Sequence, residues 1–194
     1  DVEKPNRRRN EDKATEKALG AALPEPGKIV KTEEIAELGV SEWTLSNGIK
    51  VVLKPTDFKN DEILFSSFSL GGNSLVSDSD YVSVITAESI IEGSGIGDFS
   101  KIELEKRLSD KMVHVSPFIG SLSEGVSGSA SPKDMDILFQ LIYLYLTSPR
   151  PDSAAYTSFK TRLQAYVENR NVRPESAFSD TIDVTMAQYH PRSR

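Results

Sequence analysis

The stretch YVSVITAESIIEGSGIGDF, residues 81–99, has apolar side chains at positions 81, 82, 84, 85, 87, 90 and 91. Apolar residues that recur three and four positions apart share one face of a helix, so the pattern predicts a helix over residues 81–92. Gly93 and Gly95 predict the end of this helix, because glycine adopts the left-handed conformation in which helices often terminate. The glycine run follows a helix rather than a strand, which is the wrong context for a dinucleotide-binding loop.

The residues before this helix predict three strands. Asn47-Gly48 lies between residues 43–45 and residues 49–53 and predicts a β-hairpin, because both central positions of such a turn favour positive φ. Residues 62–70 are apolar and aromatic enough to form a buried strand.

The residues after the helix predict two further strands and four further helices. Residues 112–119 and 121–130 alternate like two strands with a turn at Gly120. Helix starts are marked by the capping box Ser100-Lys101-Ile102-Glu103, by Ser131-Pro132, by Asp152 and by Pro174. The order of elements, β-β-β-α-α-β-β-α-α-α, predicts an α+β fold in which an antiparallel sheet has helices packed on one face.

Several of these segments resemble the M16 peptidase family, which includes insulinase, pitrilysin and the processing peptidases. WTLSNGIKVVLKPT (43–56) resembles the opening hairpin of M16 domains, and FSLGGNSLVSDSDYVSV (68–84) resembles the strand and glycine pair that lead into their first long helix. KPTDFKNDEI (54–63), LFQLIYLYLTSPRPD (138–152) and YHPR (189–192) are similar to the second, non-catalytic half of bacterial M16 proteases of the pitrilysin and PqqL-like type. The resemblance covers residues 40–192 and implies the LuxS/MPP-like metallohydrolase fold.

In active M16 domains the first long helix carries H-x-x-E-H, where two histidines hold zinc and the glutamate acts as general base. The matching positions in this chain are Ile85-Thr86-Ala87-Glu88-Ser89. Ile85 and Ser89 cannot replace the two imidazoles, so Glu88 has no metal-bound water to deprotonate. The resemblance therefore implies a degenerate motif, with no catalytic residue, no metal site and no cofactor in this segment.

The function that this resemblance implies is that of an inactive peptidase-like domain in a larger M16 zinc metalloprotease, where it forms part of the substrate chamber. Zinc would lie in the catalytic half of that parent protein, whose activity is metal-dependent proteolysis. The expected partners are other domains of the same polypeptide and a peptide substrate. Because these proteases are often exported, we expect a periplasmic or cell-envelope location in a bacterium.

The other candidate ligands carry weaker signals. Glu168 falls in the region where active M16 domains place their third zinc ligand, but one glutamate opposite Ile85 and Ser89 is not a zinc site. His114 falls in an expected strand and His190 lies near the end of the chain. The spacing of these histidines indicates neither a metal site nor a nucleophilic pair, so we expect structural or surface roles for both.

The charge and composition of the chain limit the kinds of molecule that it is expected to bind. A net charge of −6 and an isoelectric point near 5.1 argue against nucleic acid or an anionic membrane surface as the main partner. The longest apolar run, residues 135–146, contains Asp136 and Gln140 and is too short to span a bilayer. The lack of cysteine excludes disulfides and thiolate metal sites, and the charged residues from Asp1 onward predict no signal peptide.

The chain divides by composition into two parts. Residues 1–39 are rich in charge and contain the Arg7-Arg8-Arg9 run and a Pro-Glu-Pro-Gly break at 24–27. We predict a connector over residues 1–39, with a short helix at residues 11–19, and the peptidase-like domain over residues 40–194.

Two other functions stay open on the sequence alone. A non-enzymatic assembly subunit of the processing-peptidase core-protein type would share the fold and would oligomerise by itself. An independent hydrolase with an unrecognised site would show turnover in the isolated chain. A second helix carrying H-x-x-E-H, in a preceding part of the same polypeptide, would favour the chamber-wall interpretation over both.

Overall fold

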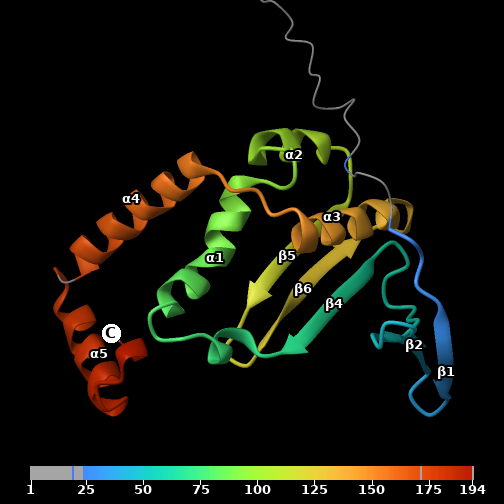
Figure 1. Ribbon diagram of the computed structural model, residues 1–194, viewed down its shortest axis with the longest axis horizontal. Coiled ribbons are helices and arrows are strands. Elements are labelled where there is room, and N and C mark those ends of the chain that lie inside the picture. The colour runs from blue at the N-terminus through green and yellow to red at the C-terminus, as the bar shows by residue number, and fades with distance from the viewer. Residues whose placement is uncertain (1–18, 20–23, 171, 194) are drawn as a thin grey trace, which may run out of the picture.

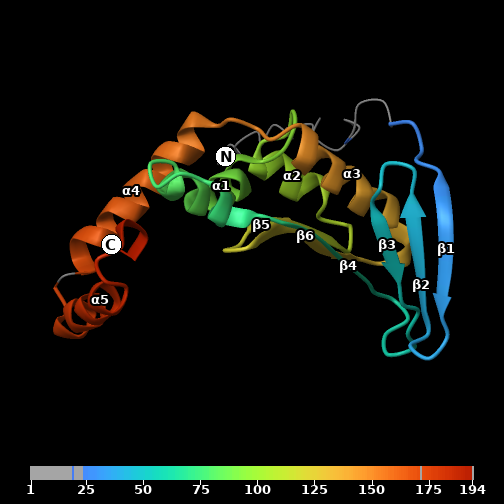
Figure 2. The same cartoon turned by 60° about the horizontal axis from the view of Figure 1, so that its bottom comes forward.

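The strands are β1 (Ile29–Ile35), β2 (Val40–Leu45), β3 (Lys50–Leu53), β4 (Ile63–Leu70), β5 (Val113–Ile119) and β6 (Ser123–Ala130). They come from a computed structural model that describes Leu19 and residues 24–170 and 172–193. The strands form two antiparallel sheets, one with the order β1-β2-β3 and the other with the order β4-β6-β5. Figure 2 shows the first sheet standing to one side of the second.

The first sheet contains the hairpin that Asn47-Gly48 predicts. Trp43 of β2 lies opposite Val51 of β3, and Gly48 has a φ of 86°. The Asn47 side chain accepts a hydrogen bond from the Ile49 N–H at 3.1 Å, which fixes the turn.

The strand β1 was not predicted from the sequence. Every side chain of its IVKTEEI segment is exposed, so the strand lacks the apolar alternation that normally reveals one. It pairs with β2 across the boundary predicted between residues 39 and 40. The domain boundary itself stays a prediction.

The helices are α1 (Tyr81–Ser94), α2 (Lys101–Arg107), α3 (Met135–Thr147), α4 (Ser153–Arg170) and α5 (Pro174–Met186). The predicted capping box forms at α2, since the Ser100 side chain accepts from the Glu103 N–H and the Glu103 side chain accepts from the Ser100 N–H. Asp152 caps α4 as predicted, since its carboxylate accepts hydrogen bonds from the N–H groups of Ala154 and Ala155 at 2.9 and 3.0 Å. The helix predicted at residues 11–19 lies outside the described residues, apart from Leu19.

The start signal Ser131-Pro132 opens a short 3₁₀ turn, Pro132–Asp134, that leads directly into α3. The buried Asp134 carboxylate accepts hydrogen bonds from the Ser131 hydroxyl at 2.6 Å and from the Met112 N–H at 3.0 Å. These two bonds, the first above all, hold the pKa of Asp134 below its usual range. The turn thereby ties the beginning of α3 to the residue that precedes β5.

The core lies between the second sheet and α3 (Figure 1), with Val126 and Leu138 almost completely buried. Gly128 of β6 lets the helix come close to the sheet. A Cβ atom at that position would lie 3.0 Å from Leu138 Cδ1 and 2.6 Å from the His114 carbonyl oxygen. The absence of a side chain is therefore what permits this packing distance.

Among the described elements, α1, α2 and α3 cover one face of the second sheet and none covers the other (Figure 2). On the other face, Leu64 and Phe68 of β4 are 78% and 73% exposed. The predicted strand at residues 62–70 is confirmed as β4, but the prediction that it is buried is therefore wrong, because apolar composition does not reveal that helices cover a single face. The predicted class, α+β with helices packed on one face of an antiparallel sheet, is confirmed, with the strands divided between two sheets rather than joined in one.

Candidate functional site

The residues matched to H-x-x-E-H, residues 85–89, lie in the middle of α1. Ile85 and Ser89 are one helical turn apart and so lie on the same side of the helix, with Glu88 beside them. All three residues are exposed. A hydrocarbon and a hydroxyl at the two positions offer no imidazole nitrogen, so the residues present do not fit a zinc ion bound as in H-x-x-E-H.

The end of α1 is fixed by backbone geometry. The buried Ser94 hydroxyl donates to the Ile90 carbonyl oxygen at 2.6 Å. Gly95 follows with a φ of 86°, and a Cβ atom there would lie 2.2 Å from the Phe99 carbonyl oxygen. Only glycine fits this position. The predicted helix end is confirmed at Gly95, but Gly93 lies inside α1, and the ψ of −157° at Gly95 is not that of the left-handed helical conformation that was expected.

The beginning of α1 is held by a residue from the other end of the chain. The Arg192 guanidinium donates to the Asp78 carboxylate at 2.7 Å. It also donates to the carbonyl oxygens of Asn73 and Val76, at 3.0 and 2.6 Å. The same cation lies 4.9 Å from the centre of the Tyr81 ring, at the first residue of α1. Part of the YHPR segment noted in the sequence thus has a structural role.

The remaining candidate ligands are spread over separate elements. Glu168 is exposed on α4 and accepts a hydrogen bond from Gln164 at 2.8 Å. His114 is exposed on β5, while exposed His190 accepts a hydrogen bond from the Arg192 N–H at 3.2 Å. Within the described residues, no three His, Asp or Glu side chains are grouped so that they could hold a metal ion.

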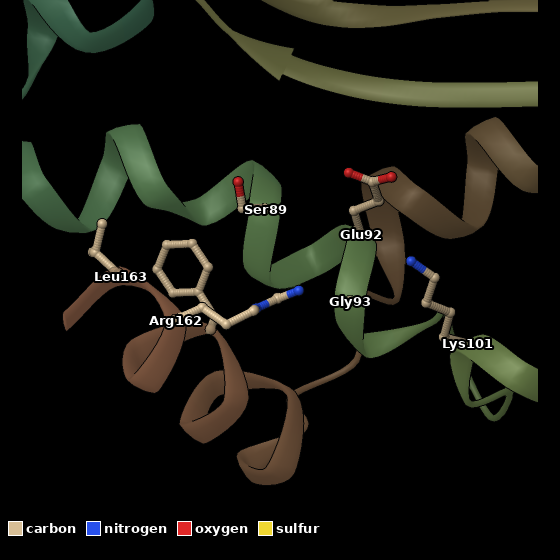
Figure 3. Close-up of a pocket in the computed structure, with 7 residues that line it drawn as sticks. Ser89, Glu92, Gly93, Lys101, Arg162 and Leu163 are labelled. Carbon is tan, nitrogen blue, oxygen red and sulfur yellow. The ribbon is translucent and has the colours of Figure 1, made fainter. Parts of the chain in front are cut away.

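A surface hollow of about 460 Å³ lies where the last turns of α1 meet α4 and the start of α2 (Figure 3). Sequence reasoning missed it, because its walls come from three elements. The sequence held part of the signal on α4, where Phe159, Arg162 and Leu163 are spaced i, i+3 and i+4 and so share the helix face that lines the hollow. The lining residues are Ser89, Glu92, Gly93, Lys101, Phe159, Arg162 and Leu163.

A second hollow, of about 350 Å³, lies beside the first and shares Glu92 and Lys101 with it. Leu104, Leu141 and Tyr145 form part of its more apolar wall. Burial raises the pKa of the Tyr145 hydroxyl, and the nearby Glu92 carboxylate adds to this effect. Tyr145 therefore stays protonated at neutral pH and can serve there as a hydrogen-bond donor.

Among curated proteins, the chain is similar to parts of two zinc proteases. It is 41% identical over 87 residues to a PQQL-like zinc protease of Arabidopsis thaliana, a match that covers 45% of this chain and 9% of that protein. It is 24% identical over 127 residues to the probable zinc protease PqqL of Haemophilus influenzae, covering 66% of this chain and 14% of that protein. No protein-family model matches the chain.

Two solved structures share the fold. The periplasmic protease PqqL from Escherichia coli superposes with a TM-score of 0.78 and 21% identity, covering 91% of this chain and 19% of that one. A mutant of the ferredoxin protease FusC, in complex with Arabidopsis ferredoxin, superposes with a TM-score of 0.75 and 18% identity, covering 84% and 18%. The chain thus spans less than a fifth of the length of these relatives. The resemblance inferred from the opening hairpin and the first long helix is confirmed.

Proposed function

We propose that this chain, a homologue of part of the PqqL-like zinc proteases, is a non-catalytic peptidase-like domain that forms part of the substrate chamber of a longer M16 metalloprotease. The observation that carries the proposal is the surface of α1. In the match to active M16 domains, Ile85 and Ser89 would take the positions of the two histidines, and both lie on one side of α1. A domain with this helix can shape a chamber and contact a substrate without performing the hydrolysis.

In this proposal the zinc ion belongs to another part of the longer protein. Both curated relatives are named zinc proteases, and this chain matches only a small part of each. Peptide hydrolysis would then take place on the catalytic half, with zinc supplying the polarised water. This chain would supply a wall and binding contacts.

The substrate in this proposal is a peptide or a protein. The fold neighbour FusC is a ferredoxin protease whose structure holds ferredoxin, so a chain that contains this fold accepts a protein as substrate. The partners would be that substrate and the other domains of the same polypeptide. The exposed apolar side chains of β4 and of α5, among them Phe68 and Phe178, would contact those domains.

The proposed location follows one relative. The fold neighbour PqqL of Escherichia coli is a periplasmic protease, and for a chain of bacterial origin we propose the same compartment or the cell envelope. Within the described residues, no helix is both long and apolar enough to cross a membrane.

The experiment that tests the proposal measures zinc and peptidase activity on the same purified, tag-free chain. After dialysis against a weak chelator, elemental analysis should find far less than one zinc ion per molecule. A mixture of unstructured peptides should stay uncut with and without added zinc. A full equivalent of retained zinc, or cleavage that a strong chelator abolishes, would contradict the proposal and favour an independent hydrolase.

A further inference from the structure

We propose that the 460 Å³ hollow between α1, α4 and the start of α2 binds a carboxylate group of a peptide, with the neighbouring apolar side chain held against the α4 wall. The inference rests on the proposed function for its context, since a chamber wall meets peptides. Its physical basis is the set of side chains that line the hollow.

Two cations of this hollow have no acidic partner among the residues that the structure describes. Among the described residues, no carboxylate lies within ion-pair distance of Lys101 or Arg162. Other arginines of the chain do have such partners, namely Arg150 with Asp152, Arg170 with Asp180 and Arg192 with Asp78. The hollow thus brings two unpaired cations to one place on the surface.

Glu92 offsets only part of this charge. It is the one carboxylate among the lining residues, against two cations. Figure 3 shows the Glu92 carboxylate on the same side as the Lys101 amine, while the Arg162 guanidinium reaches the last turn of α1 from the opposite side, below Ser89. Arg162 is therefore the group that remains available to an anion from outside.

The shape of the charged groups favours a carboxylate. A guanidinium presents parallel N–H donors that match the two oxygens of a carboxylate, and this charge-assisted pairing is stronger than a neutral hydrogen bond. The Ser89 hydroxyl lines the same hollow and can donate a further bond. Metal ions are disfavoured there, because two cationic side chains repel them.

The rest of the wall is apolar. Phe159 is half-buried and Leu163 is 39% exposed, and both lie on the α4 side of the hollow with Arg162. An apolar side chain next to the carboxylate would cover these groups and gain hydrophobic free energy. Because both cations are exposed, water and salt screen the attraction, and we expect a dissociation constant of about 1 mM.

The test titrates three dipeptides into the ¹⁵N-labelled chain and follows backbone amide shifts by NMR. Acetyl-Glu-Leu amide carries a side-chain carboxylate, acetyl-Gln-Leu acid carries a C-terminal carboxylate, and acetyl-Gln-Leu amide carries neither. We expect at least one of the two carboxylate peptides to give saturable shifts at Gly93 and Leu163, about tenfold tighter than the neutral peptide. The peptide that binds more tightly identifies the source of the carboxylate.

Two variants complete the test. Arg162→Gln should weaken carboxylate binding about tenfold, because it removes the charged guanidinium but keeps a polar side chain of similar size. Lys160→Gln is the matched control, since Lys160 lies on the same helix and is not a lining residue of this hollow, although the neighbouring hollow that it lines shares Phe159 and Leu163 with it. The proposal is overturned if the neutral peptide binds as tightly as the others, if Arg162→Gln binds like the wild type, or if no peptide binds at about 10 mM.

Failure of this inference and failure of the proposed function can be told apart. The titration uses the chain alone and requires no proteolysis. A chamber domain can lack a carboxylate site, and a carboxylate site can exist on a domain that forms no chamber.

Discussion

At the scale of single residues, the side chains at positions 85 and 89 decide what α1 can do. Ile85→His together with Ser89→His would place two imidazoles one turn apart on an exposed helix face. We expect this double variant to gain weak zinc affinity, measured by competition with a chromogenic chelator, because two ligands hold zinc less firmly than the usual three. It should not gain measurable turnover.

The matched control for that variant replaces both residues with alanine, which keeps helix propensity and adds no ligand. If the two-histidine variant cleaved a peptide and the alanine control did not, the wild-type chain would already contain a third zinc ligand and a general base. Glu88 would then have to be regarded as a retained catalytic residue.

The site was predictable at this scale only where it depends on local sequence. The helix that holds Ile85, Glu88 and Ser89 could be predicted because its apolar pattern is local, while the roles assigned to these residues stay predictions. Lys101 and Arg162 could not be associated with each other, since they come from separate helices and meet only when both pack against the end of α1. Side chains that gather through tertiary packing leave no fixed spacing in a sequence.

At the scale of elements, Arg192 attaches the end of the chain to the loop before α1. Arg192→Ala removes three hydrogen bonds and the contact with the Tyr81 ring. We expect a loss of about 1–3 kcal/mol in the free energy that protects the amides of α5 from hydrogen exchange. The amides of α3 should keep their protection, because α3 belongs to the core.

Arg192→Lys serves as the control for charge. Lysine keeps the positive charge, but it lacks the planar guanidinium whose N–H groups bind one carboxylate and two carbonyl oxygens at the same time. It should therefore recover only a small part of the lost protection. Full recovery by lysine would show that the charge, rather than the geometry of the guanidinium, holds the segment.

The Asp134 turn predicts an acid-sensitive start of α3. Its hydrogen bonds lower the pKa of Asp134 in the folded chain. The stabilisation is therefore present above the usual range of aspartate, about pH 4, and is lost as the pH falls through the lower folded-state pKa. Thermal unfolding followed by circular dichroism should show Asp134→Asn losing less stability on acidification than the wild type. An identical acid dependence would contradict this role.

Elements with strong local signals were predictable, and the others were not. The Asn47-Gly48 turn, the Ser100 capping box and the Asp152 cap each depend on a few neighbouring residues, so each could be read directly from the sequence. The exposed strand β1 gave no apolar alternation. The exposed face of β4 could not be foreseen either, because burial depends on which helices pack where.

At the scale of the whole molecule, much apolar surface is uncovered. No residue of α4 or α5 is buried, although these helices carry Tyr166 and Phe178 at 61% and 69% exposure. Figure 1 shows both helices extending away from the second sheet. Surfaces of this kind usually belong to interfaces, which agrees with a chain that spans less than a fifth of its relatives.

The proposed chamber predicts a clear outcome in the longer protein. Deleting residues 40–192 should abolish peptide cleavage while leaving zinc bound to the catalytic half. Glu88→Gln in the same protein is the matched control and should leave cleavage unchanged, since without histidines at positions 85 and 89 we expect no metal-bound water beside Glu88. Measured zinc content and initial rates check both statements. Unchanged cleavage after the deletion would favour a separate binding role.

The contact between Arg192 and Asp78 also bears on how the chain reaches its native state. The two residues are 114 positions apart, so their pairing closes a very long loop. Contacts of such high sequence separation form slowly, because the chain must first lose the entropy of that loop. During synthesis on the ribosome, the loop before α1 must wait for nearly the whole segment to emerge before it meets its guanidinium. In nascent chains stalled before residue 192, this loop should therefore still be cleaved by added proteases when the second sheet is already protected.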